Sequence, residues 1–453
     1  MDHTDRYINL SLTDAALIEQ GNHVLAAYDL QPKAGHDFQT TARYFAADIS
    51  AGTLETHASG SREYDAVVYE ALALEGLVKI AIPVELFDRN VSDGSGSISN
   101  LLNLCVGNNQ GMGDIISAKL HDFFIPPDYL KIFDGPATSI NQLWQQLGRC
   151  DGLIVGGILK PKLGMGPEEM AEAAYQFWLG GDMVDHDAAQ GNQRFAPFEE
   201  SIQQIADAMQ RSQQETGEAK FFSVNITADD HHEILARGEI ALKAFGENAS
   251  HVAFVVNGYL AGPSAVTTAR RAFPDHFLQF HRAGHAAVTS PQSTRGYSAF
   301  VLAKIARMSG ASGIHTGTMG FGTLEGHEVD RPIACMIAQD SAKGPFFQQE
   351  WGEMPRSAAI LSGGMNALRL PGFFENLGHS NLILAAGGGA FGHIDGPTAG
   401  ALSLRQAEAC WLERADPISF AREHTEFAHA FVSFQTDADI IHPGWRRALP
   451  ADQ

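Results

Sequence analysis

The sequence predicts an α/β protein in which a C-terminal (β/α)₈ TIM barrel follows an N-terminal α+β domain of ferredoxin-like type. The chain has 453 residues, which is more than the roughly 250 residues that one such barrel takes. Hydrophobic residues make up 44% of it, enough for a sizeable core. From about residue 150, apolar β-rich runs alternate eight times with amphipathic helical stretches. This alternation is typical of βα units in a parallel barrel. We expect the N-terminal domain over residues 1–132 and the barrel over 133–453.

Before residue 130 the pattern mixes helix and strand, and two runs stand out as strands. They are HVLAAYDL (23–30) and LVKIAIPV (77–84), both rich in β-branched and other apolar residues. The segment FDGPATS (133–139) combines Gly, Pro and Ser and marks the natural boundary.

The eight predicted barrel strands are short apolar runs bounded by turn residues. They lie at residues 153–160, 183–187, 221–226, 251–256, 277–283, 313–317, 358–364 and 382–388. After the second run, four apolar residues at helical spacing predict a helix whose apolar stripe packs on the barrel. These are Ile202, Ile205, Ala206 and Met209. Glycines are expected to end two helices, one at Gly180 and Gly181 and another at Gly246. Asp229 and Asp230 are expected to begin the helix that lies between these glycines.

The formal charge of −22 excludes several classes of partner. It repels phosphate backbones and anionic lipid, so neither nucleic acid nor a membrane is expected as a partner. No run approaches the roughly 18 apolar residues of a membrane span, and the first residues lack the order of a secretory signal. We expect a cytoplasmic protein. Its four cysteines, Cys105, Cys150, Cys335 and Cys410, form no C-x-x-C pair and are interpreted as reduced core thiols.

Polar residues end six of the eight predicted strands, where barrel enzymes place their catalytic groups. They are Lys160 and Lys162, Asp185 and Asp187, His281 with Arg282 and His285, His315, Ser362 with Gly363 and Gly364, and Gly387 to Gly389. The glycines after strands 7 and 8 let backbone N–H groups approach a phosphate. Arg282, His315 and Ser362 are candidates for a second phosphate site. Two anion sites flanking lysines indicate a bisphosphorylated sugar.

Several segments resemble the signature segments of form II RuBisCO, and the resemblance covers nearly the whole chain. They are GNNQGMGD (107–114), GGILKPKLG (156–164), FHRAGHAA (280–287), GIHTGTMGFG (313–322), LSGGMNAL (361–368) and AAGGGAFGHIDGP (385–397). The resemblance implies an N-terminal α+β domain, a (β/α)₈ barrel, and head-to-tail homodimers or assemblies of dimers that build each site from both chains.

The resemblance also implies roles for individual residues. Lys160 matches the base for enolisation, Lys162 its neighbour that protonates the product, and His281 a proton relay at the substrate hydroxyls. Arg282, His315 and Ser362 match one phosphate site, whereas Gly364, Gly387, Gly388 and the partner chain's Thr53 match the other. Asn108, also from the partner chain, matches a substrate contact near the metal.

Five positions depart from the family pattern. Asp185 replaces the lysine that takes up CO₂ as a carbamate, Ala188 replaces a metal-binding Glu, and Thr323 replaces the lid lysine that stabilises the nascent carboxylate; Asp48 replaces a Glu and Leu54 a polar phosphate contact. No lysine carbamate is expected. Loss of one preorganised donor typically costs about 10²–10³ in rate, so carboxylation is expected to be nearly silent.

Two accounts of the paired aspartates remain open at this stage. Strand alternation places Asp185 and Asp187 on one face with His186 turned away. In the first account the two aspartates bind a weakened Mg²⁺ together with water. In the second account Lys160 or Lys162 pairs directly with Asp185 and replaces the metal.

Three functions are consistent with these features. The first is a RuBisCO-like protein that binds a phosphorylated ketose and performs at most enolisation or isomerisation through Lys160. The second is a functional ribulose-1,5-bisphosphate carboxylase/oxygenase in which Asp185 substitutes for the carbamate. The third is a non-catalytic ligand-binding or assembly subunit.

Overall fold

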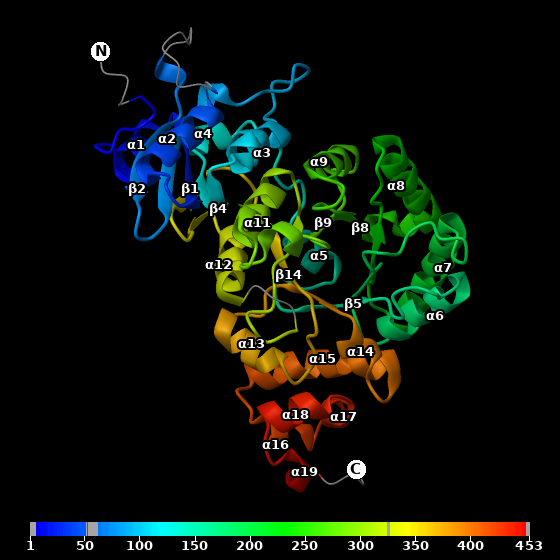
Figure 1. Ribbon diagram of the computed structural model, residues 1–453. Helices are drawn as coiled ribbons and strands as arrows, with labels where there is room; N and C mark the ends of the chain where they lie inside the picture. Colours follow the sequence, from blue (N-terminus) through cyan, green and yellow to red (C-terminus); the bar gives the residue numbers. More distant parts are fainter. Residues whose placement is uncertain (1–5, 51, 53–61, 324–326, 450–453) are drawn as a thin grey trace. The chain divides into compact units, whose positions relative to one another are not determined.

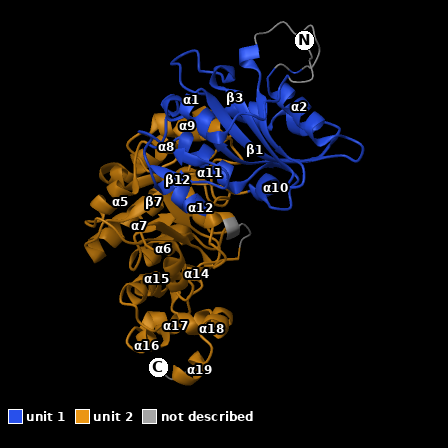
Figure 2. Cartoon of the chain, turned by 90° about the vertical axis from the view of Figure 1, so that its left-hand side faces the viewer, with its two compact units in different colours: residues 1–136, 284–310, 332–356 blue, residues 137–283, 311–331, 357–453 orange. Residues whose placement is uncertain are grey.

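The computed structural model describes residues 6–50, 52, 62–323 and 327–449. The chain divides into two compact units, coloured separately in Figure 2. Unit 1 comprises residues 1–136, 284–310 and 332–356, and unit 2 comprises residues 137–283, 311–331 and 357–453. The boundary expected after residue 132 stays a prediction.

Unit 1 is built on a five-stranded sheet with the order β10-β4-β1-β3-β2. The chain runs β1, α2, β2, β3, α3, β4, and the antiparallel order β4-β1-β3-β2 is the arrangement of a ferredoxin-like domain. The predicted strands 23–30 and 77–84 are confirmed as β1 and β3. The strands are β1 (His23–Pro32), β2 (Val67–Leu72), β3 (Leu77–Pro83), β4 (Ile115–Phe124) and β10 (Arg295–Tyr297), with a hairpin of β12 (Ser341–Lys343) and β13 (Gln348–Glu350).

The sheet of unit 1 has an apolar core on one face, where Leu25 and Ala27 of β1 pack with Phe124, Leu17 of α1 and Phe347. Tyr28 of β1 points to the other face and meets Phe45 of α2, with ring centroids 5.0 Å apart. The helices are α1 (Asp14–Gln20), α2 (Phe38–Ile49), α3 (Ile98–Val106), α4 (Pro127–Leu130), α10 (Ala286–Thr289) and α11 (Ala299–Met308). Short 3₁₀ turns lie at Arg62–Tyr64, Val84–Leu86 and Asn108–Gly111.

Unit 2 contains a closed barrel of eight parallel strands in the order β11-β14-β15-β5-β6-β7-β8-β9. The predicted fold class is confirmed, because each predicted run overlaps one of these strands, and only β8 extends beyond its run, by one residue. They are β5 (Ile154–Ile158), β6 (Met183–Asp185), β7 (Phe221–Asn225), β8 (Val252–Asn257), β9 (Leu278–His281), β11 (Gly313–His315), β14 (Ala358–Leu361) and β15 (Ile383–Ala386).

Helix α5 (Ile140–Gln146) precedes the first barrel strand, and further helices follow the barrel strands along the chain (Figure 1). Those that follow are α6 (Pro167–Trp178), α7 (Phe198–Thr216), α8 (His231–Phe245) with a 3₁₀ turn at Gly246–His251, α9 (Pro263–Ala272), α13 (Leu370–Leu377), α14 (Gly388–Phe391) and α15 (Gly396–Leu412). Four short helices complete the described chain: α16 (Pro417–Ala421), α17 (Thr425–Ser433), α18 (Gln435–Ile441) and α19 (Trp445–Ala448). Helix α12 (His327–Ala338) lies between β11 and β12 in the chain. None of the helices described is long and apolar enough to cross a membrane.

The predicted helix signals hold where the structure describes them. The apolar stripe of α7 is buried, with Ile202, Ile205, Ala206 and Met209 all among the buried residues. Gly246 ends α8 with φ +52°, and Asp230 caps its start by accepting from the His232 amide. The cysteines are free, but Cys150 is exposed, so the expectation that all four are core thiols is wrong for that residue.

The N-terminal end of the barrel is closed by packing and by a polar network. Leu143 and Trp144 of α5 pack onto Ile154, Met183 and Phe221, which begin β5, β6 and β7. This end is therefore filled, and a ligand site is expected at the opposite end of the strands.

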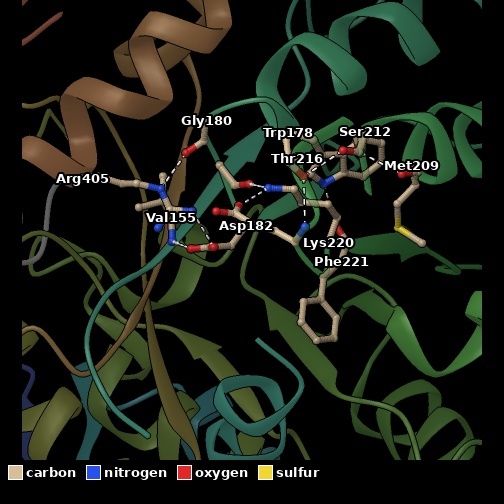
Figure 3. A network of polar contacts seen from close by, with 12 residues as sticks. Val155, Trp178, Gly180, Asp182, Met209, Ser212, Thr216, Lys220, Phe221 and Arg405 are labelled. Atoms are coloured by element: carbon tan, nitrogen blue, oxygen red, sulfur yellow. Dashed lines mark hydrogen bonds and ion pairs between the residues drawn. The ribbon is translucent and has the colours of Figure 1, made fainter. Parts of the chain in front are cut away.

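Asp182, directly before β6, is the centre of that polar network (Figure 3). Its carboxylate lies 2.7 Å from Arg149 and 2.6 Å from Arg405, and it accepts from the Val155 amide at 2.8 Å. The neighbouring Lys220 is fully buried and donates to the Gly181 carbonyl. Every charge in this network faces a partner, which is the usual condition for burying charge.

Candidate active site

The two lysines after β5 share one carboxylate. Lys160 Nζ donates to Asp187 Oδ2 at 2.5 Å, and Lys162 Nζ lies 3.5 Å from Asp187 Oδ1. The Asp187 side chain is only 9% exposed, so its charge is screened little by water. Both oxygens of Asp187 thus face ammonium groups.

Asp185 faces a different environment, the interior of the barrel. It ends β6, is buried, and accepts from Gln279 Nε2 at 3.1 Å. Its Oδ2 has no hydrogen-bond partner among the residues described. Burial raises the pKa of this carboxyl to about 6, although hydrogen bonds from Ser223 and Gln279 oppose the rise. A carboxyl placed in this way is substantially protonated in mildly acidic solution.

These contacts correct the expected pairing of Asp185 with Lys160 or Lys162. Both lysines pair with Asp187 instead. Strand β6 ends at Asp185, so Asp187 lies beyond the strand and is free of its alternation. The two aspartates therefore have separate partners, and none of these contacts requires them to share a cation.

The residues beside the aspartates explain how this segment is held. His186 points away from the lysines, as predicted, and packs edge-on against Phe222 with ring centroids 4.9 Å apart. Burial lowers its pKa to about 3. The Ala188 carbonyl accepts from the side-chain amides of Asn225 at 3.2 Å and Asn257 at 2.9 Å. At position 188 the site therefore offers a tethered backbone oxygen and no carboxylate.

Three predicted residues from β9, β11 and β14 come together on one side of the site. His315 Nδ1 and Ser362 Oγ are 2.9 Å apart, and the rings of His281 and His315 lie 4.5 Å apart, centre to centre. Burial lowers the pKa of His281 to about 4, and burial with nearby Arg282 and His281 lowers that of His315 further. Both imidazoles are therefore neutral at physiological pH and present hydrogen-bonding nitrogens. Burial also lowers the pKa of Arg282, against the attraction of Asp330.

Two of the glycines predicted to bind a phosphate lie close to other residues of the site, Gly364 to Thr323 and Gly387 to Lys160. Gly364 has φ +84°, and a Cβ added there would meet Thr323 Oγ1 at 2.7 Å. The Thr323 amide donates to the Gly363 carbonyl at 3.0 Å. A Cβ at Gly387 would lie 2.8 Å from Lys160 Cε, whereas one at Gly388 would meet nothing within 4 Å. Glycine at 387 thus leaves room for the lysine, and Gly388 leaves its backbone open.

The remaining predicted residues belong to unit 1 or lie outside the described residues. Asn108 begins a 3₁₀ turn and is exposed, and Asp48 is exposed in the last turn of α2. Thr53 and Leu54 lie outside the described residues. The roles of these four residues stay predictions. For Thr53 and Asn108, the role implied by the resemblance is in the site of the partner chain.

Sequence reasoning missed four polar residues that organise the site. Ser223 and Gln279 bind each other at 2.6 Å inside the barrel, and Asn225 and Asn257 hold the Ala188 carbonyl. A signal was present for three of them, because Ser223, Asn225 and Gln279 are polar residues within runs predicted to be strands, whereas Asn257 directly follows such a run. Buried polar groups need partners, so such residues indicate a network.

Comparison with known families gives two matches that together cover most of the chain. Residues 11–129 match the model described as the N-terminal domain of the ribulose bisphosphate carboxylase large chain. Residues 139–434 match the model of its catalytic domain.

Individual relatives and solved structures agree with these matches. The chain is 60% identical over 456 residues to a ribulose bisphosphate carboxylase of Rhodopseudomonas palustris strain TIE-1, covering 99% of each chain. Its fold is similar to a dimeric archaeal Rubisco from Hyperthermus butylicus, with TM-score 0.84, 30% identity, and coverage of 94% of this chain and 98% of that one. An octameric Rubisco from Pyrococcus horikoshii gives TM-score 0.82 at 27% identity, with coverage of 95% and 98%.

Proposed function

Because the chain belongs to the ribulose bisphosphate carboxylase large-chain family, we propose that its barrel binds a phosphorylated ketose, with ribulose bisphosphate as the leading candidate. We further propose that it is a RuBisCO-like member of form II type whose reaction stops at enolisation or isomerisation. The form II type is supported by the segments that resemble form II enzymes; the relatives' names state no form.

The observation that carries this proposal is the environment of Asp185 and Asp187. Position 185, where the family resemblance places the carbamate lysine, holds a buried carboxyl bound to Gln279, and it has no amine to take up CO₂. Asp187 faces Lys160 and Lys162, and Ala188 has no ligand atom in its side chain. This donor set does not fit the family's magnesium site, so no step is assigned to a metal. A weakened Mg²⁺ site would require Asp187 to exchange its lysines for the ion.

The two ends of the sugar bisphosphate are assigned to the two groups of polar residues. Arg282, His315 and Ser362 bind one phosphate through a cation and hydrogen bonds. The backbone N–H groups at Gly364, Gly387 and Gly388, with the partner chain's Thr53, bind the other. This placement sets the carbon chain of the ligand beside Lys160.

Enolisation needs a base, and Lys160 is the proposed one. Its ammonium bonds Asp187 at 2.5 Å, so a base forms only when that proton moves away, to Asp187 or to water. The neutral amine then removes the C3 proton of the ketose, and returning the proton to a different carbon completes an isomerisation. Neutral His281 is the proposed relay at the hydroxyls.

The carboxylation step is where the chain lacks the required charge. A new carboxylate has to be stabilised by a cation, and Thr323 brings only a hydroxyl to that position near Gly364, because its amide donates to the Gly363 carbonyl. Loss of one such donor costs about 10²–10³ in rate, and the lid change is combined with the changes at 185 and 188. We therefore propose that carboxylation is lost.

The second candidate function is ribulose bisphosphate carboxylation itself. It is favoured by the relatives, since a chain 60% identical over almost its full length is named ribulose bisphosphate carboxylase. The comparisons support this candidate better than they support loss of activity, whereas the altered residues support loss. A non-catalytic ligand-binding or assembly subunit is the third candidate and predicts binding alone.

We also propose that the chain assembles as a homodimer or a higher assembly of dimers. The similar solved structures are named dimeric and octameric. A dimer would supply the partner chain's Thr53 and Asn108 to each barrel site. Gel filtration with light scattering tests this, and a monomer at micromolar concentration would contradict it.

One experiment separates the three functions. The protein is incubated with ribulose bisphosphate, labelled bicarbonate, Mg²⁺ and D₂O, and both label in phosphoglycerate and deuterium at C3 are followed. We expect exchange at C3 without fixation. Fixation at a rate near that of the Rhodopseudomonas palustris relative establishes the second function, and tight binding with neither signal establishes the third.

A further inference from the structure

A group of metal-ligating side chains lies at the start of α8, apart from the lysines and aspartates of the candidate active site. Asp230, His231 and His232 are exposed, and each offers one ligand atom such that the three atoms lie within 4.8 Å of one another. Within the part of the chain that the structure describes, no other set of three or more His, Cys, Asp or Glu side chains has this spacing.

The local backbone holds these side chains together. Asp230 is the N-cap of α8, and its Oδ1 accepts from the His232 amide at 2.9 Å. The imidazole rings of His231 and His232 lie 3.9 Å apart, centre to centre, and His231 Nδ1 is 3.6 Å from Asp230 Oδ1. One helical turn therefore presents a carboxylate and two imidazoles on the same side.

We propose that Asp230, His231 and His232 form a binding site for a divalent transition-metal ion of the Zn²⁺ class. Two imidazole nitrogens with one carboxylate suit Zn²⁺, Ni²⁺ and Cu²⁺, whereas Mg²⁺ takes oxygen ligands and retains its water. Three protein ligands leave one position of a tetrahedral ion for water. The site is thus selective against the ion that the family resemblance implies for the active site.

The spacing needs only a small adjustment to bind such an ion. Zinc bonds of about 2.0–2.2 Å at tetrahedral angles place neighbouring ligand atoms about 3.3–3.6 Å apart. His231 and Asp230 already match this spacing at 3.6 Å, and their side chains are 59% and 63% exposed and so can rotate. Glu233 is held by Arg237 at 2.7 Å, so it does not compete as a ligand.

Two electrostatic effects act on the ion in opposite directions. The N-terminal end of a helix carries partial positive charge and repels a cation. The formal charge of −22 and the adjacent Asp229 attract one. The exposed position and the helix end together favour an ion that exchanges with solution.

The site bears on any metal analysis of the active site. Helix α8 follows β7, so the group lies at the carboxyl end of the barrel strands, as Lys160 and Asp187 do. Zinc found in the purified protein would then reside at α8, independently of whether the proposed function holds.

The test is equilibrium dialysis of the full chain against Zn²⁺, with and without millimolar Mg²⁺. The chain has 19 histidines, so the readout is the difference between variants. His231→Ala and His232→Ala should each lose one equivalent of bound zinc or weaken it at least about tenfold, because even loss of an outer hydrogen-bond partner weakens metal binding about 10–100-fold. Asp230→Asn should also weaken it while keeping the cap, since Asn caps helices as well as Asp does.

Asp229→Asn is the matched control, because it removes a neighbouring charge that is no member of the group. It should retain the equivalent of zinc that the other variants lose. Equal binding by wild type and both histidine variants would overturn the proposal, as would equal losses in Asp229→Asn and Asp230→Asn, or displacement of zinc by Mg²⁺. Thermal melting checks that each variant is folded. Because His231 and His232 are substituted in separate variants, the test can still be read if one of the two variants fails to fold.

Discussion

Asp182 lies directly before β6 and Asp185 ends it, so one strand carries a buried carboxyl at each end of the barrel. Asp182 faces two arginines and a backbone amide. Asp185 accepts from Gln279, and its second oxygen has no hydrogen-bond partner among the described residues. We call the N-terminal end of the barrel strands the lower end and the C-terminal end the upper end. The charge of Asp182, at the lower end, is compensated by its partners, whereas the carboxyl of Asp185, at the upper end, is not.

This difference matches the division of labour in such barrels, where the N-terminal end supports stability and the C-terminal end performs chemistry. Full pairing around Asp182 lowers the free energy of the folded state without leaving a group for a ligand. At Asp185 one carboxyl oxygen has no partner among the described residues and is left for a ligand or a proton, at a cost in stability. Changes at the upper end should therefore affect activity, and changes at the lower end should affect folding.

The largest expected effect is at the upper end. Lys160→Ala should lower C3 exchange on ribulose bisphosphate by about 10²–10⁴, the usual contribution of a general base. Affinity for the sugar should change little, because the phosphate residues remain. Lys243→Ala, at an exposed lysine of α8, is the control. Full exchange in Lys160→Ala, measured by NMR in D₂O, would remove Lys160 from the reaction.

At the lower end, Asp182→Ala should lower the free energy of unfolding by about 3–5 kcal/mol, because it leaves Arg149 and Arg405 without their carboxylate. Exchange per folded molecule should be unchanged. Urea denaturation measures the first and NMR the second.

The control for this change is Glu172→Ala, which breaks the exposed pair with Arg211 and should cost at most about 1 kcal/mol. Equal destabilisation by Asp182→Ala and Glu172→Ala would show that the network around Asp182 contributes no more to the free energy of unfolding than an exposed ion pair does.

A smaller effect follows from the raised pKa of Asp185, about 6 against about 3.9 in an unfolded chain. The carboxyl is protonated in both states below about pH 3.9. Stability is lost as the pH rises from there to about 6, because the unfolded chain releases the proton first, and above pH 6 both states are ionised and the loss is complete. Asp185→Asn removes this loss. Between about pH 4.5 and about pH 8, wild type should lose about 2 kcal/mol of unfolding free energy relative to this variant.

The control for the pH experiment is Asp151→Asn, which removes an exposed carboxylate. Its stability relative to wild type should be the same at both pH values. A difference between wild type and Asp185→Asn that is also independent of pH would mean that Asp185 is ionised in the fold throughout this range.

The smallest expected effect concerns Gly387. Gly387→Ala places a methyl group 2.8 Å from Lys160 Cε, so the lysine has to move. Exchange should fall about tenfold, since displacements near 1 Å cost up to about 10²-fold. Gly166→Ala, outside the proposed phosphate sites, is the control, because no atom lies nearer than 3.8 Å to its added Cβ. Equal rates for both variants would mean that Lys160 is positioned by Asp187 alone.

Much of the fold was predictable because it depends on local patterns. Eight short apolar runs are each long enough for a strand, and only a barrel buries all of them together. The stripe of α7 and the cap at Asp230 depend on helical spacing and on one turn of backbone. The sequence also indicated which polar residues end the strands, because strand ends follow from the same runs.

The choice of partner at those ends was not predictable. The sequence left open whether a metal or a lysine meets Asp185. In the structure Lys160 and Lys162 reach Asp187 instead, which lies two residues beyond the end of β6 and outside its alternation. Gln279 lies 94 positions from Asp185 in the chain and meets it only across the closed barrel.

The sequence by itself indicated the family and the two-part architecture, and it predicted five replaced positions. Only the tertiary structure decided which charge faces which, and hence that Asp182 is compensated while Asp185 is not. The physical reason is that burial and hydrogen bonding depend on distances between strands far apart in the chain. Local spacing sets which way a side chain points, but not what it meets there.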